Sequence, residues 1–151
     1  MSEVCTFVGH REAPLSLYPY LVEEVWRLSK NGVSEFWVGG YGAFDQMAER
    51  AVREAKIKMP QITLSLILAY LPVGEQKSEL QKYDNMIYPE GLERVPRRYA
   101  IDRRNNWIVH NADFLLAYVT HSWGGAATTL SKAQSRERDG KLTIINLGEK
   151  L

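Results

Sequence analysis

Short runs rich in β-branched and aromatic residues alternate with longer amphipathic segments along this chain of 151 residues. The spacing of the apolar residues predicts strands over residues 4–8, 35–38, 63–71, 113–119 and 142–146. The segments between them have helical spacing and predict helices over residues 16–30, 43–58, 97–111 and 126–139. Because strict alternation of strands and helices implies right-handed crossovers, the pattern predicts an α/β protein with a parallel sheet.

The length and composition fit one globular domain over residues 1–151. Hydrophobic residues make up 45% of the chain and charged residues 25%, which is typical of a protein with a single packed core. We therefore expect a Rossmann-like three-layer sandwich with a mainly parallel, five-stranded sheet.

The chain carries no sign of a membrane or secretory segment. No apolar run approaches the roughly 20 residues that a membrane span needs, so no membrane partner is expected. The opening Met1-Ser2-Glu3 lacks the basic start of a signal peptide, and we expect a cytoplasmic protein. The single cysteine, Cys5, lies in an apolar segment and is expected to be a buried, unreactive thiol.

One long stretch, residues 72–96, interrupts the alternation of strands and helices. An irregular loop of about 25 residues is uncommon inside a compact domain and often has a function, for example as a lid over a site. The alternative is a broken helix over residues 75–83, and the sequence does not decide between the two.

Glycine-rich turns follow three of the predicted strands. Gly9 follows the first strand, Gly39-Gly40 follows the second, and Gly124-Gly125 follows the fourth. In a parallel sheet these turns lie at one edge, where ligands bind beyond the carboxyl ends of the strands. Two of the turns lead directly into helices, whose N-termini suit phosphate. The alternative is that the glycines only form turns, and none of the turns has the G-x-G-x-x-G spacing of a dinucleotide fingerprint.

Several motifs follow one another in order along the chain. They are Gly9-x-Arg11, Gly39-Gly40-x-x-x-x-Asp45, Arg104-Asn105, Asp113 and Gly124-Gly125-x-x-Thr128. This series resembles the SLOG superfamily, which includes the DNA-processing protein DprA, the LOG phosphoribohydrolases and the small YpsA-like proteins. The glycine motifs look most like the YpsA-like branch. The resemblance implies a Rossmann-like domain that binds nucleotides or nucleotide-derived molecules.

The candidate ligand-binding residues lie in the turns and on the helix predicted over residues 97–111. They are Gly9, His10, Arg11, Gly39, Gly40, Asp45, Arg104, Asn105, Ser122, Trp123, Gly124, Gly125 and Thr128. The resemblance implies that Gly124, Gly125 and Thr128 hold phosphate and that Arg104 reaches in from the helix. Trp123 is the aromatic residue that we expect to contact a ligand or a second subunit.

One departure from the LOG proteins bears on catalysis. Their P-G-G-x-G-T-x-x-E motif ends in a glutamate that takes part in cleaving the base from the ribose. The matching position here is Ser131, which cannot act as a general base near neutral pH. A LOG-type phosphoribohydrolase is therefore disfavoured, while Asp45, Glu90 or Glu93 remain carboxylates that could serve a different reaction.

The favoured function is binding of a nucleotide-type small molecule, such as ADP-ribose, NAD or a nucleotide second messenger, by a sensor or sequestering protein. The alternative is an enzyme that cleaves an N-glycosidic bond in nucleotides, of the LOG or nucleoside deoxyribosyltransferase type. Single-stranded DNA binding as in DprA is weaker, because Glu90, Glu93 and Asp102 lie beside or within the basic cluster of Arg94, Arg97, Arg98, Arg103 and Arg104. We expect a homo-oligomer, no cofactor, and no metal site, since the histidines are scattered.

Overall fold

A six-stranded sheet lies at the centre of the computed structural model, which describes residues 3–72 and 80–149. Its strands are β1 (Glu3–Gly9), β2 (Val33–Val38), β3 (Thr63–Ile67), β4 (Asn85–Ile87), β5 (Phe114–Tyr118) and β6 (Thr143–Asn146). The strands lie in the order β4-β3-β2-β1-β5-β6, and all neighbours are parallel. The predicted parallel sheet is thus confirmed.

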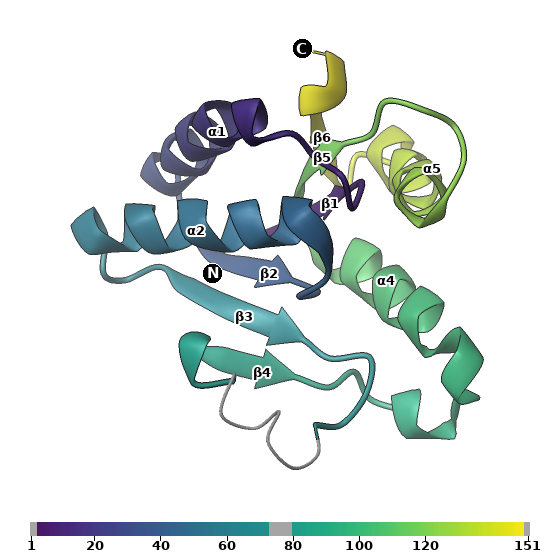
Figure 1. Cartoon of the computed structure of the whole chain (residues 1–151). Helices are drawn as coiled ribbons and strands as arrows, with labels where there is room; N and C mark the ends of the chain where they lie inside the picture. Colours follow the sequence, from purple (N-terminus) through teal and green to yellow (C-terminus); the bar gives the residue numbers. More distant parts are fainter. Residues whose placement is uncertain (1–2, 73–79, 150–151) are drawn as a thin grey trace.

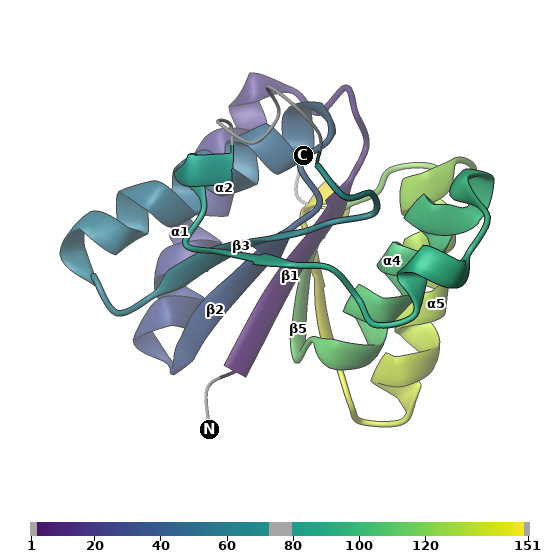
Figure 2. The ribbon, with the colours of Figure 1, turned by 90° about the horizontal axis from the view of Figure 1, so that it is seen from below.

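Helices cover both faces of the sheet (Figures 1 and 2). The α-helices are α1 (Tyr18–Lys30), α2 (Gly42–Lys58), α4 (Ala100–Asn111) and α5 (Gly125–Arg138). Single turns of 3-10 helix lie in the connections at Leu15–Leu17, Leu80–Lys82, Leu92–Arg94, Arg97–Tyr99 and Leu147–Glu149. Since α1 packs beside α2 on one face and α4 beside α5 on the other, the predicted three-layer α/β sandwich is confirmed. Over residues 3–72 and 80–149, no helix has both the length and the apolarity needed to cross a bilayer.

Each face of the sheet has its own hydrophobic core, because neighbouring residues of a strand point to opposite faces. In β2, Phe36 packs into the core beneath α1 and α2. The next residue, Trp37, belongs to the opposite core and stacks on Trp107, with ring centroids 5.1 Å apart. Cys5 of β1 has no exposed surface, and burial raises the pKa of its thiol, as expected for an unreactive cysteine.

The number of strands predicted from the sequence is wrong by one, because β4 lies in the stretch over residues 72–96. A strand of three residues at the edge of the sheet is too short to show an alternating pattern. Of the alternative helix over residues 75–83, residues 75–79 lie outside the described residues, and residues 80–82 form a single 3-10 turn. A lid in this stretch stays a prediction.

β3 is shorter than predicted and ends at Ile67 rather than at Leu71. The apolar residues that follow leave the sheet, and Ala69 packs against Leu92 and Ala100 in a third hydrophobic cluster. An apolar run does not by itself distinguish a buried strand from a buried loop. Here the first part of the run forms β3 and the rest forms a buried loop. The early end of β3 matters for the site because it leaves room at the carboxyl edge of the sheet.

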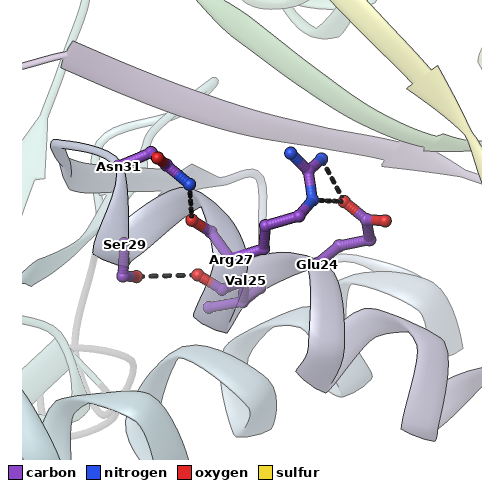
Figure 3. A network of polar contacts seen from close by, with 5 residues as sticks. All are labelled: Glu24, Val25, Arg27, Ser29 and Asn31. Atoms are coloured by element: carbon purple, nitrogen blue, oxygen red, sulfur yellow. Dashed lines mark hydrogen bonds and ion pairs between the residues drawn. The ribbon is translucent and has the colours of Figure 1, made fainter.

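Side-chain hydrogen bonds mark the end of α1, which agrees with its predicted end near residue 30 (Figure 3). The side-chain amide of Asn31 donates to the carbonyl of Arg27 (2.7 Å), and the hydroxyl of Ser29 donates to the carbonyl of Val25 (2.8 Å). Arg27 Nε also donates to Glu24 Oε2 (3.0 Å). The Asn31 bond satisfies one of the carbonyls that the last turn of a helix leaves unpaired, and the chain then enters β2.

Candidate ligand-binding site

A cavity of about 530 Å³, the first cavity, opens at the carboxyl ends of β1, β2 and β5. The strand order reverses here, since β2 and β5 lie on opposite sides of β1, and parallel α/β sheets bind ligands at such a point. Most of the candidate residues line this cavity. They are Gly9, His10, Arg11, Gly39, Asp45, Arg104, Asn105, Trp123, Gly124 and Gly125. The structure brings these residues together, and their contact with a ligand stays a prediction.

Three candidate residues do not line the first cavity. Gly40 lines a neighbouring cavity instead; its φ is +83°, and a Cβ atom there would lie 2.9 Å from Leu66 Cδ1. The backbone and the packing of Leu66 therefore account for this glycine. Ser122 and Thr128 are exposed, and the Thr128 hydroxyl donates to the carbonyl of Gly124 (3.1 Å).

The N-terminus of α5 borders the first cavity. Gly124 precedes the helix with φ +93°, a conformation that residues with a side chain rarely adopt. No side chain caps the first turn, so its backbone N–H groups lack the acceptors that later turns have. A Cβ atom at Gly124 or Gly125 would meet no described atom within 4 Å. The glycines leave open access to these N–H groups, which together with the helix dipole suit an anion.

Arg104 extends from α4 toward the ends of β2 and β3 and is only 5% exposed. Its Nη1 donates to the carbonyls of Gly39 (3.2 Å) and Ile67 (3.4 Å), and its Nε donates to Asn105 Oδ1 (3.2 Å). Burial lowers the pKa of its guanidinium, while the negative charge of Asp45 favours the protonated form. Arg104 forms no ion pair with a carboxylate in the described part of the chain. A buried positive charge therefore stands at the cavity wall with only neutral hydrogen-bond partners.

Asp45 lies in the first turn of α2, and its carboxylate accepts a hydrogen bond from the N–H of Tyr41 (3.3 Å). Burial raises its pKa to about 6, against the opposing effects of the Tyr41 N–H and the nearby charge of Arg104. A carboxyl group with such a pKa exchanges protons close to neutral pH, which is what general acid or base chemistry requires. The same bond also fixes the turn before α2, so Asp45 has a structural role as well.

Three aromatic rings stack at the rim of the first cavity. The rings of His10 and His121 have centroids 3.8 Å apart, and His121 and Trp123 are stacked at the same distance. Nε2 of His10 accepts a hydrogen bond from the N–H of Thr120 (2.9 Å), which leaves its proton on Nδ1 when the ring is neutral. Burial, followed by the neighbouring His121, lowers the pKa of His10. Because Trp123 is 69% exposed, a further planar ring has access to the end of the stack.

Comparisons with known proteins give matches among solved structures, while no family model and no curated protein matches the chain. The molybdenum cofactor carrier protein from Chlamydomonas reinhardtii aligns with a TM-score of 0.62 and 15% identity, covering 98% of this chain and 78% of that chain. The molybdenum cofactor binding protein from Rippkaea orientalis aligns with a TM-score of 0.60 and 16% identity, covering 99% and 82%.

DNA processing protein A (DprA) from Streptococcus pneumoniae aligns with a TM-score of 0.57 and 12% identity over 98% of this chain. DprA belongs to the superfamily that the ordered glycine motifs resemble. The chain shares its fold with these proteins. At these identities the likeness concerns the fold, and this chain spans 60% of the DprA chain. The YpsA-like branch of the SLOG proteins stays a prediction.

The structure also places Ser131, the residue that matches the LOG glutamate position. Ser131 is exposed on α5 and does not line the first cavity. Of the carboxylates named as alternatives, Asp45 lines the cavity, whereas Glu90 and Glu93 are exposed and do not. Glu12, which was not a candidate, also lines it. Asp45 and Glu12 are therefore the carboxylates to consider for any reaction in the first cavity.

The candidate residues omit His121, Tyr41 and Thr129, which also line the first cavity. His121 and Tyr41 lie in turns that follow strands, and this position could have identified them as candidate site residues from the sequence. Thr129 follows the predicted Thr128, and one residue along a helix turns a side chain by about 100°. Only the buried face of α5 therefore identifies the threonine that lines the cavity. Among the described residues, no three histidine, cysteine or acidic side chains gather as a metal site requires.

Proposed function

We propose that the protein binds a nucleotide or nucleotide-derived ligand in the first cavity and acts as a sensor or sequestering protein. The observation that carries this proposal is the buried guanidinium of Arg104 at the cavity wall. A buried charge is costly without a charged partner, and an anionic group on the ligand would supply one. Phosphate is the anion that fits best, because its oxygens match the planar set of donors on arginine.

Two other parts of the first cavity suit a further phosphate and the base of a nucleotide. The open N-terminus of α5 offers backbone N–H groups to a phosphate. The exposed face of Trp123 offers a surface for a base, and stacking of a base on an aromatic side chain contributes about 1–3 kcal/mol. Groups that suit phosphate together with a surface for a planar ring fit the chemistry of ADP-ribose, NAD or a nucleotide second messenger.

The molybdenum cofactor proteins with the same fold support a small-molecule ligand. The molybdenum cofactor itself therefore belongs among the compounds to test. We further propose that the chain is a cytoplasmic homo-oligomer of the YpsA-like branch with a single domain over residues 1–151. The exposed Trp123 is one residue that a subunit contact could cover.

A thermal-shift panel tests the proposal on the wild-type protein. Mononucleotides, NAD, ADP-ribose, cyclic nucleotides and the molybdenum cofactor are compared with their phosphate-free counterparts. A ligand at a hundredfold excess over its Kd stabilises the folded state by about 2.7 kcal/mol, which raises the melting temperature by roughly 5 °C or more for a domain of this size. A panel in which only phosphate-free compounds raise the melting temperature would remove the anion from the proposal.

A second candidate function, cleavage of an N-glycosidic bond, is favoured by the raised pKa of Asp45 in the first cavity. Incubation with AMP and other nucleotides, followed by chromatography for free base, measures this activity. Because Ser131 replaces the LOG glutamate, we expect no steady release of adenine from AMP by the wild-type protein. Release that is lost in an Asp45→Asn variant would establish the enzyme instead of the binding protein.

Single-stranded DNA binding remains the weakest candidate, supported by the likeness of the fold to DprA. Such binding rests on phosphate contacts and falls steeply with added salt. A titration of a fluorescent oligonucleotide at two salt concentrations separates it from binding of a nucleotide in a buried site, which salt affects less.

A further inference from the structure

A second cavity, of about 550 Å³, lies beside the first and is lined by residues at the ends of β2 and β3. The two cavities share Gly39, Tyr41 and Arg104 as part of their walls. Each volume falls within the range of about 300–1,000 Å³ that is typical of small-molecule sites. Arg104 therefore stands between two spaces, each large enough for a nucleoside-sized group.

Aromatic side chains that are held in place line the second cavity. The hydroxyl of Tyr83 donates to Glu49 Oε2 (2.9 Å), and the hydroxyl of Tyr70 donates to the carbonyl of Arg97 (3.1 Å). The Arg97 guanidinium lies 4.3 Å from the centroid of the Tyr70 ring. Leu71 completes this wall and is 61% exposed. The fixed rings of Tyr70 and Tyr83 can pack against a planar base or a sugar, and the Arg97 guanidinium favours an anionic group beside it.

The boundary between the two cavities suits an anionic linker. Nη1 of Arg104 donates to backbone carbonyls, whereas Nη2 has no acceptor among residues 3–72 and 80–149. Next to it, a Cβ atom at Gly39 would lie 3.0 Å from Arg104 Nη2, so the glycine leaves room for the guanidinium at the boundary. The Tyr41 ring lies with its centroid 5.6 Å from the Arg104 guanidinium carbon and also faces both cavities.

We infer that the ligand has two nucleoside-like groups joined by an anionic linker, with the linker at Arg104 and one group in each cavity. This inference rests on the proposed function and narrows it to the dinucleotide class, in which a diphosphate joins two nucleosides. A mononucleotide confined to the first cavity would leave Tyr70, Tyr83 and Leu71 without contact to the ligand.

Calorimetric titration of the full chain with NAD and with AMP tests the inference. NAD is expected to bind at least tenfold more tightly than AMP, because it alone fills both cavities. Leu71→Asp places a carboxylate in the wall of the second cavity and should lower the affinity for NAD at least fivefold more than the affinity for AMP. Ile57→Asp is the matched control, since Ile57 is 82% exposed and lines neither cavity, and it should change neither affinity.

Trp123→Ala removes a ring from the first cavity and should lower the affinities for NAD and for AMP by similar factors. Equal affinities for NAD and AMP would overturn the two-part ligand and leave the proposed function standing. An advantage of NAD that survives Leu71→Asp would also overturn it, because the second group would then lie elsewhere. If neither compound binds, the inference fails, whereas the proposed function fails only if no phosphate-bearing compound of the thermal-shift panel binds either.

Discussion

Replacement of Arg104 should lower the affinity for a ligand more than replacement of any other single residue. Its removal takes away a charge-assisted contact, so Arg104→Ala should weaken binding of the best compound in the panel by about 1.5–3 kcal/mol. The variant also leaves the carbonyls of Gly39 and Ile67 without a donor, so its melting temperature has to be measured beside the titration. Calorimetry well below that temperature isolates the effect on binding.

Arg98→Ala is the matched control for Arg104→Ala. Arg98 is exposed, lies over the Tyr99 ring (4.9 Å) and lines neither cavity, so its loss should leave the affinity nearly unchanged. Equal losses in the two variants would point to a diffuse basic surface and hence to nucleic acid.

Asp45 should make the stability of the protein depend on pH. Its folded pKa of about 6 lies above the ordinary value, so the folded state binds more protons than the unfolded state between about pH 4 and pH 6. Stability from this group is therefore lost as the pH rises through that range. Asp45→Asn keeps an acceptor for the Tyr41 N–H and should be more stable than the wild type by about 1–3 kcal/mol at pH 7.5, but not at pH 4.

Urea unfolding at the two pH values measures this difference for Asp45→Asn. A difference between variant and wild type that is the same at both pH values would show that the carboxyl group titrates normally.

Single residues were predictable where a turn or a motif marked them, and not where packing decides. The position of Arg104 in a motif identified it, but its burial and its hydrogen bond to the carbonyl of Ile67 result from packing that the sequence does not reveal. The stack of His10, His121 and Trp123 joins two turns that only the pairing of β1 with β5 brings together.

At the scale of elements, the first turn of α5 is the part of the site that can be altered without touching the core. Gly124→Ala should cost about 1 kcal/mol of stability through its positive φ, since open space surrounds the new Cβ. The methyl group should also hinder an anion that approaches the N–H groups, and should lower the affinity for phosphate ligands at least fivefold.

Gly140→Ala controls for the strain, because Gly140 follows the other end of α5 with φ +73° and is equally open. Both variants should lose similar stability in thermal melts, and only Gly124→Ala should lose affinity. Unchanged affinity in Gly124→Ala would remove the N-terminus of α5 from the site.

The elements of the sandwich followed from the sequence wherever the apolar pattern was long and periodic, as in α2. β4 was not predicted, because three residues at a sheet edge are too few to show a periodic pattern. The end of β3 was predicted too late, because its apolar run continues into the loop that packs on Leu92 and Ala100. The second cavity was therefore not predictable, since that loop forms much of its wall.

At the scale of the whole molecule, Cys5 offers a measurement of global unfolding. It is the only cysteine of the chain and has no exposed surface in the central strand β1. A thiol reagent should label the native protein only after unfolding, so a ligand that stabilises the fold by 2.7 kcal/mol should slow labelling about a hundredfold. Mass spectrometry follows the reaction, and rapid labelling of the native protein would contradict the burial of Cys5.

The central position of β1 has a consequence during synthesis. The N–H of Val4 donates to the carboxylate of Asp113 (2.8 Å), a partner 109 residues further along the chain. At about 5–20 residues per second, a ribosome needs roughly 5–20 s to deliver that partner. Throughout this interval the growing chain has β1 with one side unpaired, and such an apolar strand edge invites aggregation. The edge of the central strand is therefore open to pairing with another chain until β5 has been synthesised.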